Sequence, residues 1–507
     1  MSVSDRQPAA RFDDLDWDNR LAALGETYAA PQAPTPLAYP PHPVAFSPDV
    51  AASLGLDPAV ADDPDFVAVV AGNRVPAGAA PVAQVYAGHQ FGVRVPRLGD
   101  GRAILLGQVR GPDGRLRDIQ LKGAGRTPYA RGADGRAILH STVREFLASE
   151  AMAGLGIPTT RALAVVGSDD PVQREVPHTA AVLARVADTH VRFGSFEYFF
   201  YREMFDALAP LADHVIAAEY PDLTAIADDA ERYRAWMAAV IDRTAELVAD
   251  WQAVGFVHGV MNTDNMSVTG QTLDYGPFAF MDGYIPNWTP NHSDMHGRYA
   301  FDRQPTIALW NLGRFVQAIL PLLAHHADDA VAIGREALDA YRGRFDAAYR
   351  RRMRAKLGLR EARDGDDTLL EGLLRRMAAE SADYTRVFRA LGRVGAADDA
   401  PAGPFLDEFA DREAAASWVA DWRTRLAAEG TTDDAERRAR MEAVNPKYVL
   451  RTYLAEAAVE RAREGDFGEI ERLRRILSAP CDEQPAHEDY ARLPPEWARG
   501  IALSCSA

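Results

Sequence analysis

Residues 103–122 read AILLGQVRGPDGRLRDIQLK, in which two segments rich in apolar residues flank the turn sequence Gly-Pro-Asp-Gly. This pattern predicts a β-hairpin with strands at 103–110 and 115–122. Alternation along the second strand places Lys122 on the face opposite Ile119 and Leu121. The N-terminal half of the chain is therefore expected to contain a sheet with a lysine at one strand end.

A glycine-rich loop precedes the hairpin. Gly99 and Gly101 flank Asp100 in the stretch RLGDGR (97–102), and a second glycine-rich stretch, GAGRTPYARGADGR, follows at 123–136. Because glycine has no Cβ, backbone amides in such a loop can approach a phosphate closely. An ordinary turn is the alternative interpretation of the loop.

A helix is predicted over residues 139–155, because apolar residues recur there every three or four positions and Gly156 with Pro158 ends the pattern. Glu145 lies on the flank of this helix. Its carboxylate could hold the ammonium of Lys122, as a lysine–glutamate pair does in kinases. A solvated lysine and an exposed helix glutamate are the alternatives.

The rest of the chain is predicted to become helical. Two further strands are expected at about 160–167 and 179–187, and the proline-rich segment 28–43 is expected to wrap a surface. Apolar periodicity, with the start signals Gln304-Pro305 and Asn445-Pro446, predicts helices at 231–252, 305–325, 330–357, 366–392, 405–428 and 446–463. A strand-rich half followed by a helical half is an α+β arrangement suited to holding a nucleotide between two lobes.

The length and this change of pattern predict several structural units. We expect an N-terminal extension that wraps the core (1–80), a strand-rich N-lobe (81–197), a helical C-lobe with the catalytic loop and metal site (198–480), and a C-terminal tail (481–507).

The composition is that of a folded, acidic protein. Hydrophobic residues at 47% and charged residues at 25% exclude a mainly disordered chain. The net charge of −17 disfavours nucleic acid polymers and anionic membranes as partners. No uninterrupted apolar run approaches the roughly 18 residues of a membrane span, and the first residues resemble neither a signal nor a transit peptide, so a cytoplasmic location is expected. With only Cys481 and Cys505, a disulfide framework or cysteine-rich zinc site is excluded.

A second cluster of residues with side chains suited to binding a metal lies in HGVMNTDN (258–265) and the following TLDYG (272–276). If Asn265 and Asp274 converge, they give Mg²⁺ or Mn²⁺ two oxygen ligands, while phosphate and water fill the remaining positions. Two ordinary turns are the alternative. The catalytic loop of kinases also has an asparagine seven residues after its histidine, but Val260 stands here at the position of the kinase aspartate base.

Longer strings resemble one known family. They are YAGHQFG (86–92), LGDGR (98–102), QLKGAGRTPYAR (120–131), DGRAILHSTVREFL (134–147), HGVMNTDN (258–265), DYGPFAFMDGY (274–284), NHSD (291–294) and GRYAFDRQP (297–305). Together they resemble the selenoprotein O family, also called YdiU proteins, from about residue 80 to residue 325.

The resemblance implies a protein-kinase-like bilobal fold with extra C-terminal helices. It also implies that ATP binds in an orientation flipped relative to kinases and donates AMP to Ser, Thr or Tyr hydroxyls of proteins. The positions that match the family's nucleotide contacts are Gly99, Gly101, Arg102, Lys122, Asp134, Gly135, Arg185, Arg192 and Asp274. Glu145 matches the partner of Lys122, Asn265 and Asp274 match the magnesium ligands, and Asp264 matches the proton acceptor.

Three other functions are alternatives to adenylyl transfer. They are a phosphotransferase that uses Asp264 as its base, a nucleotide-binding pseudokinase that only scaffolds partners, and a structural protein. Val260 disfavours the first, and the combination of Lys122, Asn265 and Asp274 disfavours the other two.

In the segment HSDMH (292–296), His292, Asp294 and His296 could together bind a metal ion. Exposed or helix-capping side chains are the favoured interpretation. Cys505 matches a position where many members of the resembled family carry selenocysteine or cysteine, which implies a redox switch. Their partner cysteine corresponds to Pro290 here, and Cys481 is the only remaining partner within the chain. Two reduced thiols are therefore expected.

Overall fold

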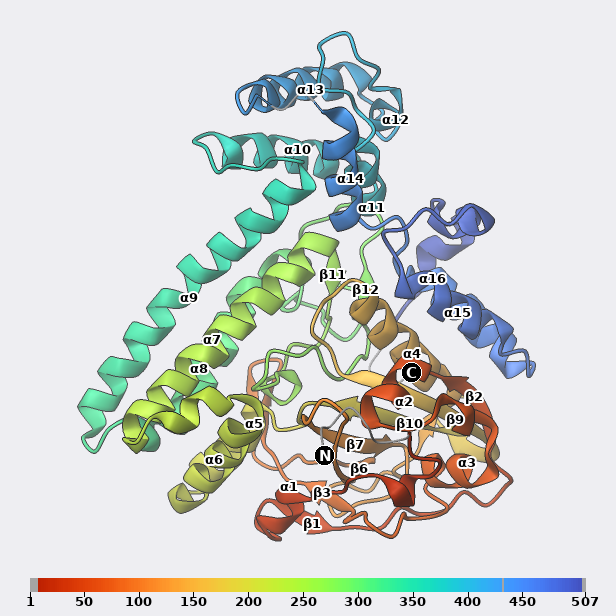
Figure 1. Cartoon of the computed structure of the whole chain (residues 1–507), viewed down its shortest axis with the longest axis vertical. Coiled ribbons are helices and arrows are strands. Elements are labelled where there is room, and N and C mark those ends of the chain that lie inside the picture. Colours follow the sequence, from red (N-terminus) through yellow and green to blue (C-terminus); the bar gives the residue numbers. More distant parts are fainter. Residues whose placement is uncertain (1–7, 431–432, 504–507) are drawn as a thin grey trace.

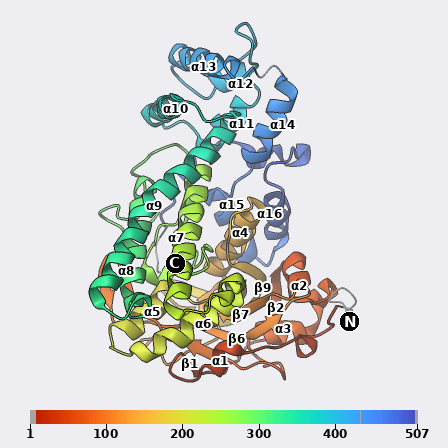
Figure 2. The ribbon, with the colours of Figure 1, turned by 60° about the vertical axis from the view of Figure 1, so that its left-hand side comes forward.

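A computed structural model describes residues 8–430 and 433–503 of the chain (Figure 1). The strands of the main sheet lie together at one end of the molecule, where short N-terminal helices cover them. Long helices extend from this body toward a separate group of helices at the opposite end (Figures 1 and 2). The strand-rich N-terminal part and the helical C-terminal part are those of the expected α+β, kinase-like fold.

The main sheet is antiparallel, with strand order β1-β3-β6-β7-β10-β9-β2, and β8 pairs with β10. Its strands are β1 (Ala29–Pro31), β2 (His42–Phe46), β3 (Val82–Gln84), β6 (Ala103–Arg110), β7 (Leu116–Lys122), β8 (Ala137–Ile138), β9 (Arg161–Gln173) and β10 (Pro177–Ala187). Strands β6 and β7 confirm the predicted hairpin, and β9 and β10 confirm the next two strands at greater length. Two small two-stranded sheets lie outside this sheet: the hairpin of β4 (Gly88–Gln90) with β5 (Val93–Val95), and β11 (Phe256–Val257) with β12 (Ala279–Phe280).

The two faces of the sheet bury different side chains. Ile119 and Leu121 of β7 pack in an apolar cluster with α2 (Pro48–Leu54) and α3 (Pro64–Val70). Lys122 is on the opposite face, as the alternation predicts, and approaches α4 (Leu139–Gly154). The sheet therefore directs its polar strand residues toward the rest of the molecule.

The predicted helices at 139–155, 231–252, 305–325 and 330–357 are confirmed as α4, α7, α8 and α9. Three of these have the bounds α7 (Asp229–Val254), α8 (Gln304–Leu323) and α9 (Ala327–Lys356). The other α-helices not yet given are α1 (Arg20–Ala23), α5 (Phe193–Phe200), α6 (Leu208–Glu219), α10 (Asp366–Glu380), α11 (Tyr384–Leu391), α12 (Gly403–Leu406), α13 (Arg412–Ala427), α14 (Asp434–Val444), α15 (Thr452–Arg463) and α16 (Gly468–Ser478).

Three helix predictions were wrong in their bounds. The single helix expected at 366–392 is divided into α10 and α11, because Ser381 adopts a left-handed conformation (φ 52°) and Asp383 caps the new helix. The helix expected at 405–428 is interrupted before α13, where Asp411 accepts a hydrogen bond from the amide of Ala414. Local capping thus outweighed the continuous apolar pattern.

The third error concerns the helix expected from Asn445-Pro446, which begins only at Thr452 as α15. Asn445 instead follows the end of α14, and its side-chain amide donates to the carbonyl of Lys356 (3.0 Å). The backbone amides of Lys447 and Tyr448 both donate to the carbonyl of Pro480. These tertiary bonds hold residues 445–451 out of a helix.

Helix α8 is the centre of the helical body. Within the described residues, Phe301–Leu323 is the one helical segment long and apolar enough to cross a membrane by length and composition, with a mean hydropathy of 1.3. It meets this criterion although Asn311 and Arg314 interrupt the apolar run. Phe315 is fully buried and its ring contacts that of Trp236 in α7, so this side of α8 is core.

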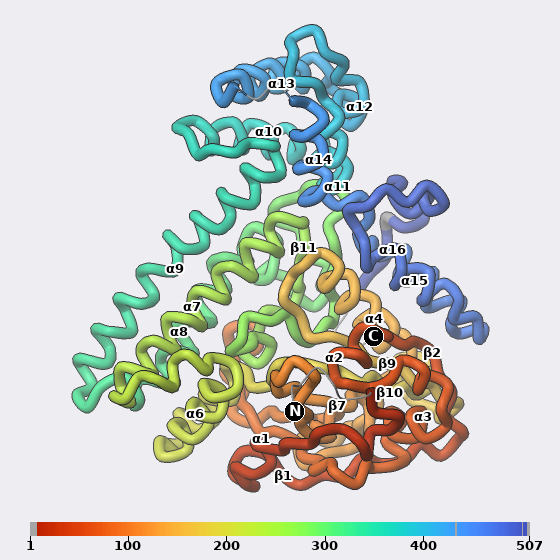
Figure 3. Tube along the Cα trace, in the orientation of Figure 1, coloured from red at the N-terminus to blue at the C-terminus, as the bar shows by residue number. Residues whose placement is uncertain are grey.

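The C-terminal helices return to the sheet-bearing body. The trace passes from α9 through α10 to α14 and then back through α15 and α16 to α4 (Figure 3). At the contact between α4 and α16, a Cβ at Gly154 would overlap the carbonyl oxygen of Leu477. The close approach of these helices therefore requires glycine at this position.

We predict that Gly154→Ala lowers the free energy of unfolding by about 1–3 kcal/mol, because the added methyl must displace backbone of α16. Gly343→Ala in α9 is the matched control, since a Cβ there meets no atom within 4 Å. The control is expected to be neutral or to stabilise by up to about 1 kcal/mol. Urea unfolding of both variants tests this, and equal effects would contradict the packing argument.

Candidate functional site

One cavity of about 710 Å³ lies between the sheet and the helical body. Its volume is in the range of ligand-binding pockets. The structure brings together at its wall every residue predicted to contact nucleotide or metal or to accept a proton: Gly99, Gly101, Arg102, Lys122, Asp134, Gly135, Arg185, Arg192, Asp264, Asn265 and Asp274. Glu145 lies beneath this wall, in contact with Lys122.

The glycine loop forms one edge of the cavity, and its glycines are required by close packing. Gly99 has a positive φ of 118°, and a Cβ there would overlap the ring of Tyr129. A Cβ at Gly101 would lie 3.0 Å from the carbonyl oxygen of Tyr129. Asp100 turns inward, where its carboxylate accepts the backbone amide of Gln84 (3.0 Å) and anchors the loop.

Lys122 and Glu145 form the predicted ion pair, and Arg185 of β10 binds the second oxygen of the same carboxylate. Burial lowers the pKa of Lys122 to about 8, and the positive charge of Arg185 adds to this, whereas Glu145 opposes it. Burial alone would raise the pKa of Glu145, but Arg185 and Lys122 hold it below its usual value. The carboxylate therefore stays ionised between two cations.

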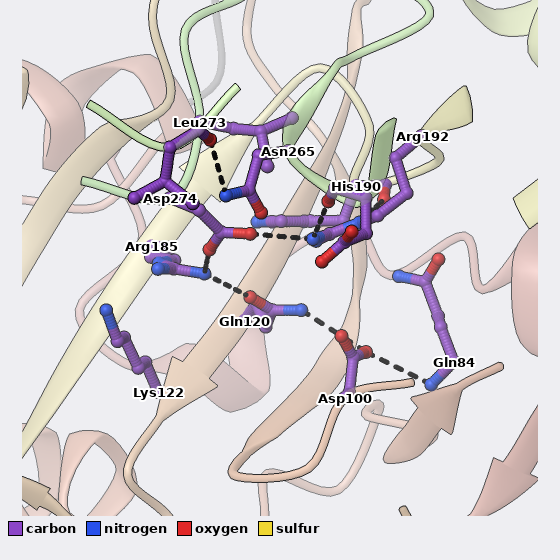
Figure 4. Close-up of polar contacts among 12 residues, drawn as sticks. Gln84, Asp100, Gln120, Lys122, Arg185, His190, Arg192, Asn265, Leu273 and Asp274 are labelled. Atoms are coloured by element: carbon purple, nitrogen blue, oxygen red, sulfur yellow. Dashed lines mark hydrogen bonds and ion pairs between the residues drawn. The ribbon is translucent and has the colours of Figure 1, made fainter. Parts of the chain in front are cut away.

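Asp274 is held between two arginines. Arg185 Nη1 contacts Asp274 Oδ1 and Arg192 Nη1 contacts Oδ2, each at 2.7 Å (Figure 4). Burial would raise the pKa of Asp274, yet these charges and that of Lys122 hold it far below its usual range. A quarter of its side-chain surface (25%) stays exposed, so a ligand in the cavity can reach this carboxylate.

A buried histidine joins the two loops that carry Asn265 and Asp274. His258 Nε2 donates to the carbonyl of Leu273 (3.0 Å), and its Nδ1 accepts the amide of Val260 (3.3 Å). Burial lowers the pKa of His258, which keeps the ring neutral and able to make both bonds. The histidine of this loop thus fixes the distance between the two predicted metal ligands.

The oxygen donors of this region fit a divalent cation. Asn265 Nδ2 donates to the carbonyl of Val260 (2.9 Å), and its amide oxygen has no hydrogen bond to another described residue at the cavity wall. Asp274 supplies an ionised carboxylate, although a cation must share its oxygens with Arg185 and Arg192. No cluster of three or more His, Cys, Asp or Glu suited to a metal occurs in the described part of the chain. A cation here would therefore depend on two protein ligands and on a bound polyphosphate.

Asp264 lies in a short 3-10 turn, Thr263–Asn265, and its backbone carbonyl accepts Arg192 Nη1 (2.8 Å). Its carboxylate is buried and receives a hydrogen bond from Gln90 Nε2 (3.1 Å). Burial raises the pKa of Asp264 to about 7, against the opposing effects of Gln90 and Arg192. A carboxylate with such a pKa can hold a proton near neutral pH.

The second glycine-rich stretch forms the opposite edge of the cavity. Gly135 has a positive φ of 75°, and a Cβ there would overlap backbone of Gly125. Asp134 pairs with Arg174 of the β9–β10 hairpin (2.7 Å), a contact with no local sequence signal. Burial and the nearby charge of Arg185 lower the pKa of Arg102. Arg102 adds positive charge to the cavity wall, whereas Arg174 is paired with Asp134.

The cavity is basic although the protein is acidic. Its cationic lining residues are Arg102, Lys122, Arg131, Arg136, Arg144, Arg174, Arg185 and Arg192, and its acidic ones are Asp100, Asp134, Asp264 and Asp274. An excess of cations in a partly enclosed cleft attracts anions such as polyphosphates. Of these residues, Arg131, Arg136, Arg144 and Arg174 were not predicted, because each becomes part of the site only through the tertiary fold.

In the 292–296 segment, His292 and His296 are exposed, as expected, whereas Asp294 is buried and does not cap a helix. The carboxylate of Asp294 accepts the backbone amides of Arg298 (2.9 Å) and Tyr299 (2.7 Å). Cys481 is a half-buried free thiol. Cys505 lies outside the described residues, so the expectation of two reduced thiols stays a prediction.

The chain is similar to proteins of one family over nearly its whole length. The chain matches the family described as protein adenylyltransferase SelO over residues 11–478. It is 53% identical to a protein named protein nucleotidyltransferase YdiU from Thioalkalivibrio sulfidiphilus, with 98% of this chain and 100% of the relative covered. A protein of the same name from Myxococcus xanthus is 51% identical, with 98% and 100% covered, and one from Paraburkholderia xenovorans is 50% identical, with 97% and 95% covered.

We predict that Asp274→Asn lowers the free energy of unfolding by about 2 kcal/mol or more, because two buried guanidinium groups lose their shared counter-charge. Inorganic pyrophosphate should restore part of this stability by binding the same guanidinium groups. Asp134→Asn is the matched control, since its pair with Arg174 is more exposed and is expected to contribute less than about 1 kcal/mol. Equal losses in the two variants by urea unfolding would contradict the assignment.

Proposed function

Because the chain belongs to the protein adenylyltransferase SelO family, we propose that it transfers AMP from ATP to Ser, Thr or Tyr hydroxyls of proteins. One observation carries the proposal. The buried carboxylate of Asp264 lies beside Asn265 and near Asp274 in a basic cavity, while Val260 stands where kinases have their base. This arrangement supplies a proton acceptor and a metal pair without the kinase aspartate.

The cavity residues divide into two groups for binding ATP. Gly99, Gly101 and Gly135 line the cavity, where backbone without a side chain can approach the ligand closely. Lys122, Arg185 and Arg192 supply positive charge for the polyphosphate. A bound Mg²⁺, or Mn²⁺ in its place, would neutralise further phosphate charge, with Asn265 and Asp274 as its protein ligands.

The proposed reaction is an in-line displacement at the α-phosphorus. The acceptor hydroxyl oxygen forms a bond to this phosphorus, and the bond between the phosphorus and the bridging oxygen of pyrophosphate breaks. Pyrophosphate leaves with the electron pair, and the hydroxyl proton passes to the carboxylate of Asp264. Arg185, Arg192 and Lys122 stabilise the negative charge that grows on pyrophosphate. This chemistry requires ATP to bind with its α-phosphate toward Asp264, opposite to its orientation in kinases.

The same residues bear on the other candidate functions. In a phosphotransferase, Asp264 would face the terminal phosphate. A scaffold would have no need of a metal pair in which Arg185 and Arg192 both hold Asp274. We further infer a cytoplasmic protein without nucleic acid polymers or membranes as partners, which the net charge of −17 supports.

Label transfer tests the proposed function. The protein is incubated with candidate acceptor proteins, Mg²⁺ and ATP labelled at either the α- or the γ-phosphate. The proposal predicts that α-label becomes bound to protein and γ-label leaves as pyrophosphate. Protein-bound γ-label would identify a phosphotransferase, and ATP binding without transfer of either label would identify a scaffold.

We predict that Asp274→Ala and Lys122→Ala each lower the rate of AMP transfer at least about 100-fold, because each removes charge that acts on the reacting phosphates. Chelation of divalent ions with EDTA should abolish transfer, and added Mg²⁺ should restore it. Asp421→Ala, an exposed aspartate on α13, is the control and should retain the wild-type rate. Near-normal transfer by Asp274→Ala would reject the assignment of the metal pair.

A further inference from the structure

A small hairpin lies directly on the loop that carries Asp264. Strands β4 and β5 are joined by Phe91 and Gly92, whose φ angles of 51° and 83° are both positive. Two positive φ angles are typical of a two-residue type I′ turn, and glycine favours this conformation. Phe91 is not glycine, so contacts outside the hairpin must hold its backbone in place.

Those contacts come from the catalytic loop and its neighbour. The amide of His89 donates to Thr263 Oγ1 (2.7 Å), and the amide of Phe91 donates to the hydroxyl of Tyr299 (2.8 Å). A Cβ at Gly88 would overlap the carboxylate of Asp264, so strand and carboxylate are in direct contact. The hairpin is therefore fixed relative to the proposed proton acceptor.

Gln90 connects the hairpin to the proposed proton acceptor, Asp264. Among the described residues, its amide is the one side-chain donor that binds the carboxylate of Asp264. The hairpin register pairs Gln90 with Val93, so these two side chains share one face, while His89 and Arg94 share the other. The hairpin face that bears Gln90 therefore extends from the contact with Asp264 to the side chain of Val93.

This region of the surface is apolar and positively charged. Phe91 also lines the cavity and is 40% exposed, and Val93 is 69% exposed. Arg298 packs against Gly92, and its buried Nε has no hydrogen-bond partner among the described residues. Neither Arg298 nor Arg97 forms an ion pair with a described carboxylate, although most arginines of this acidic protein do.

We propose that the β4–β5 hairpin binds the acceptor protein: Gln90 positions the carboxylate of Asp264, and Phe91, Val93, Arg97 and Arg298 bind a segment with apolar and acidic residues beside the target hydroxyl. The proposal rests on adenylyl transfer as the function of the cavity. Apolar residues next to the hydroxyl cover Phe91 and Val93, and acidic residues pair with the two arginines. The hydroxyl then loses its proton to Asp264 as its oxygen bonds to the α-phosphorus and pyrophosphate leaves.

Two synthetic peptides test the binding surface. Both carry a central Ser between Leu residues, and the outer positions are Glu in one peptide and Lys in the other. With α-labelled ATP and Mg²⁺, the wild-type enzyme should use the Glu peptide with about tenfold higher kcat/KM, because complementary charge favours it. Arg298→Glu should reverse this preference while the Kd for ATP stays unchanged.

Arg375→Glu is the matched control, because Arg375 is exposed on the distant helix α10 and forms no ion pair with a described carboxylate. It should keep the wild-type preference. Equal use of the two peptides by the wild-type enzyme, or an unchanged preference in Arg298→Glu, would overturn the docking surface alone. Transfer of γ-label to either peptide would instead contradict the proposed function.

Gln90→Leu tests the positioning role separately. Loss of the amide should lower kcat for the Glu peptide about tenfold, while KM for the peptide and Kd for ATP stay within about twofold of wild type. A role limited to folding would lower thermal stability and ATP affinity together with kcat. That result, or a normal kcat, would overturn the assignment of Gln90.

Discussion

The structure depends on a buried chain of ion pairs that links parts of the protein far apart in sequence. Arg185, on β10, contacts Glu145 of α4 and Asp274 of the helical half, and Arg192 contacts the second oxygen of Asp274. Burying charged groups is costly unless each has a close counter-charge. The sheet, the helix α4 and the segment that carries Asp274 must therefore dock together for any of these charges to be stable, and their docking forms the cavity.

This constraint also explains the character of the cavity. Asp274 pairs with two arginines in the protein alone, and its partly exposed carboxylate can also bind a cation. An incoming polyphosphate can take over part of its role as their counter-charge. The same charged groups therefore serve the proposed AMP transfer and stabilise the folded site. Removing one of them is expected to lower both the rate of transfer and the stability of the protein. On the other side of the cavity, the β4–β5 hairpin fixes Asp264 through direct packing and Gln90.

Local sequence patterns predicted the parts of the fold that local rules control. The alternation around Ile119, Leu121 and Lys122 gave the correct faces of β7, and the spacing from His258 to Asn265 identified a loop that the histidine does hold. Apolar periodicity did not reveal the breaks at Ser381 and Asp411, where capping overrides the pattern. It also could not place the start of α15, because tertiary bonds to Pro480 decide it. Arg174 and Gln90 had no local signal, since their partners, Asp134 and Asp264, lie 40 and 174 residues away along the chain.

A crystal structure of the protein with Mg²⁺ and a nonhydrolysable ATP analogue tests the central claim most directly. The account predicts a cation between the oxygens of Asn265 and Asp274, contacts of Arg185 and Arg192 with the outer phosphates, and the α-phosphate nearest the carboxylate of Asp264. The terminal phosphate at Asp264, or a nucleotide bound outside the cavity, would contradict it.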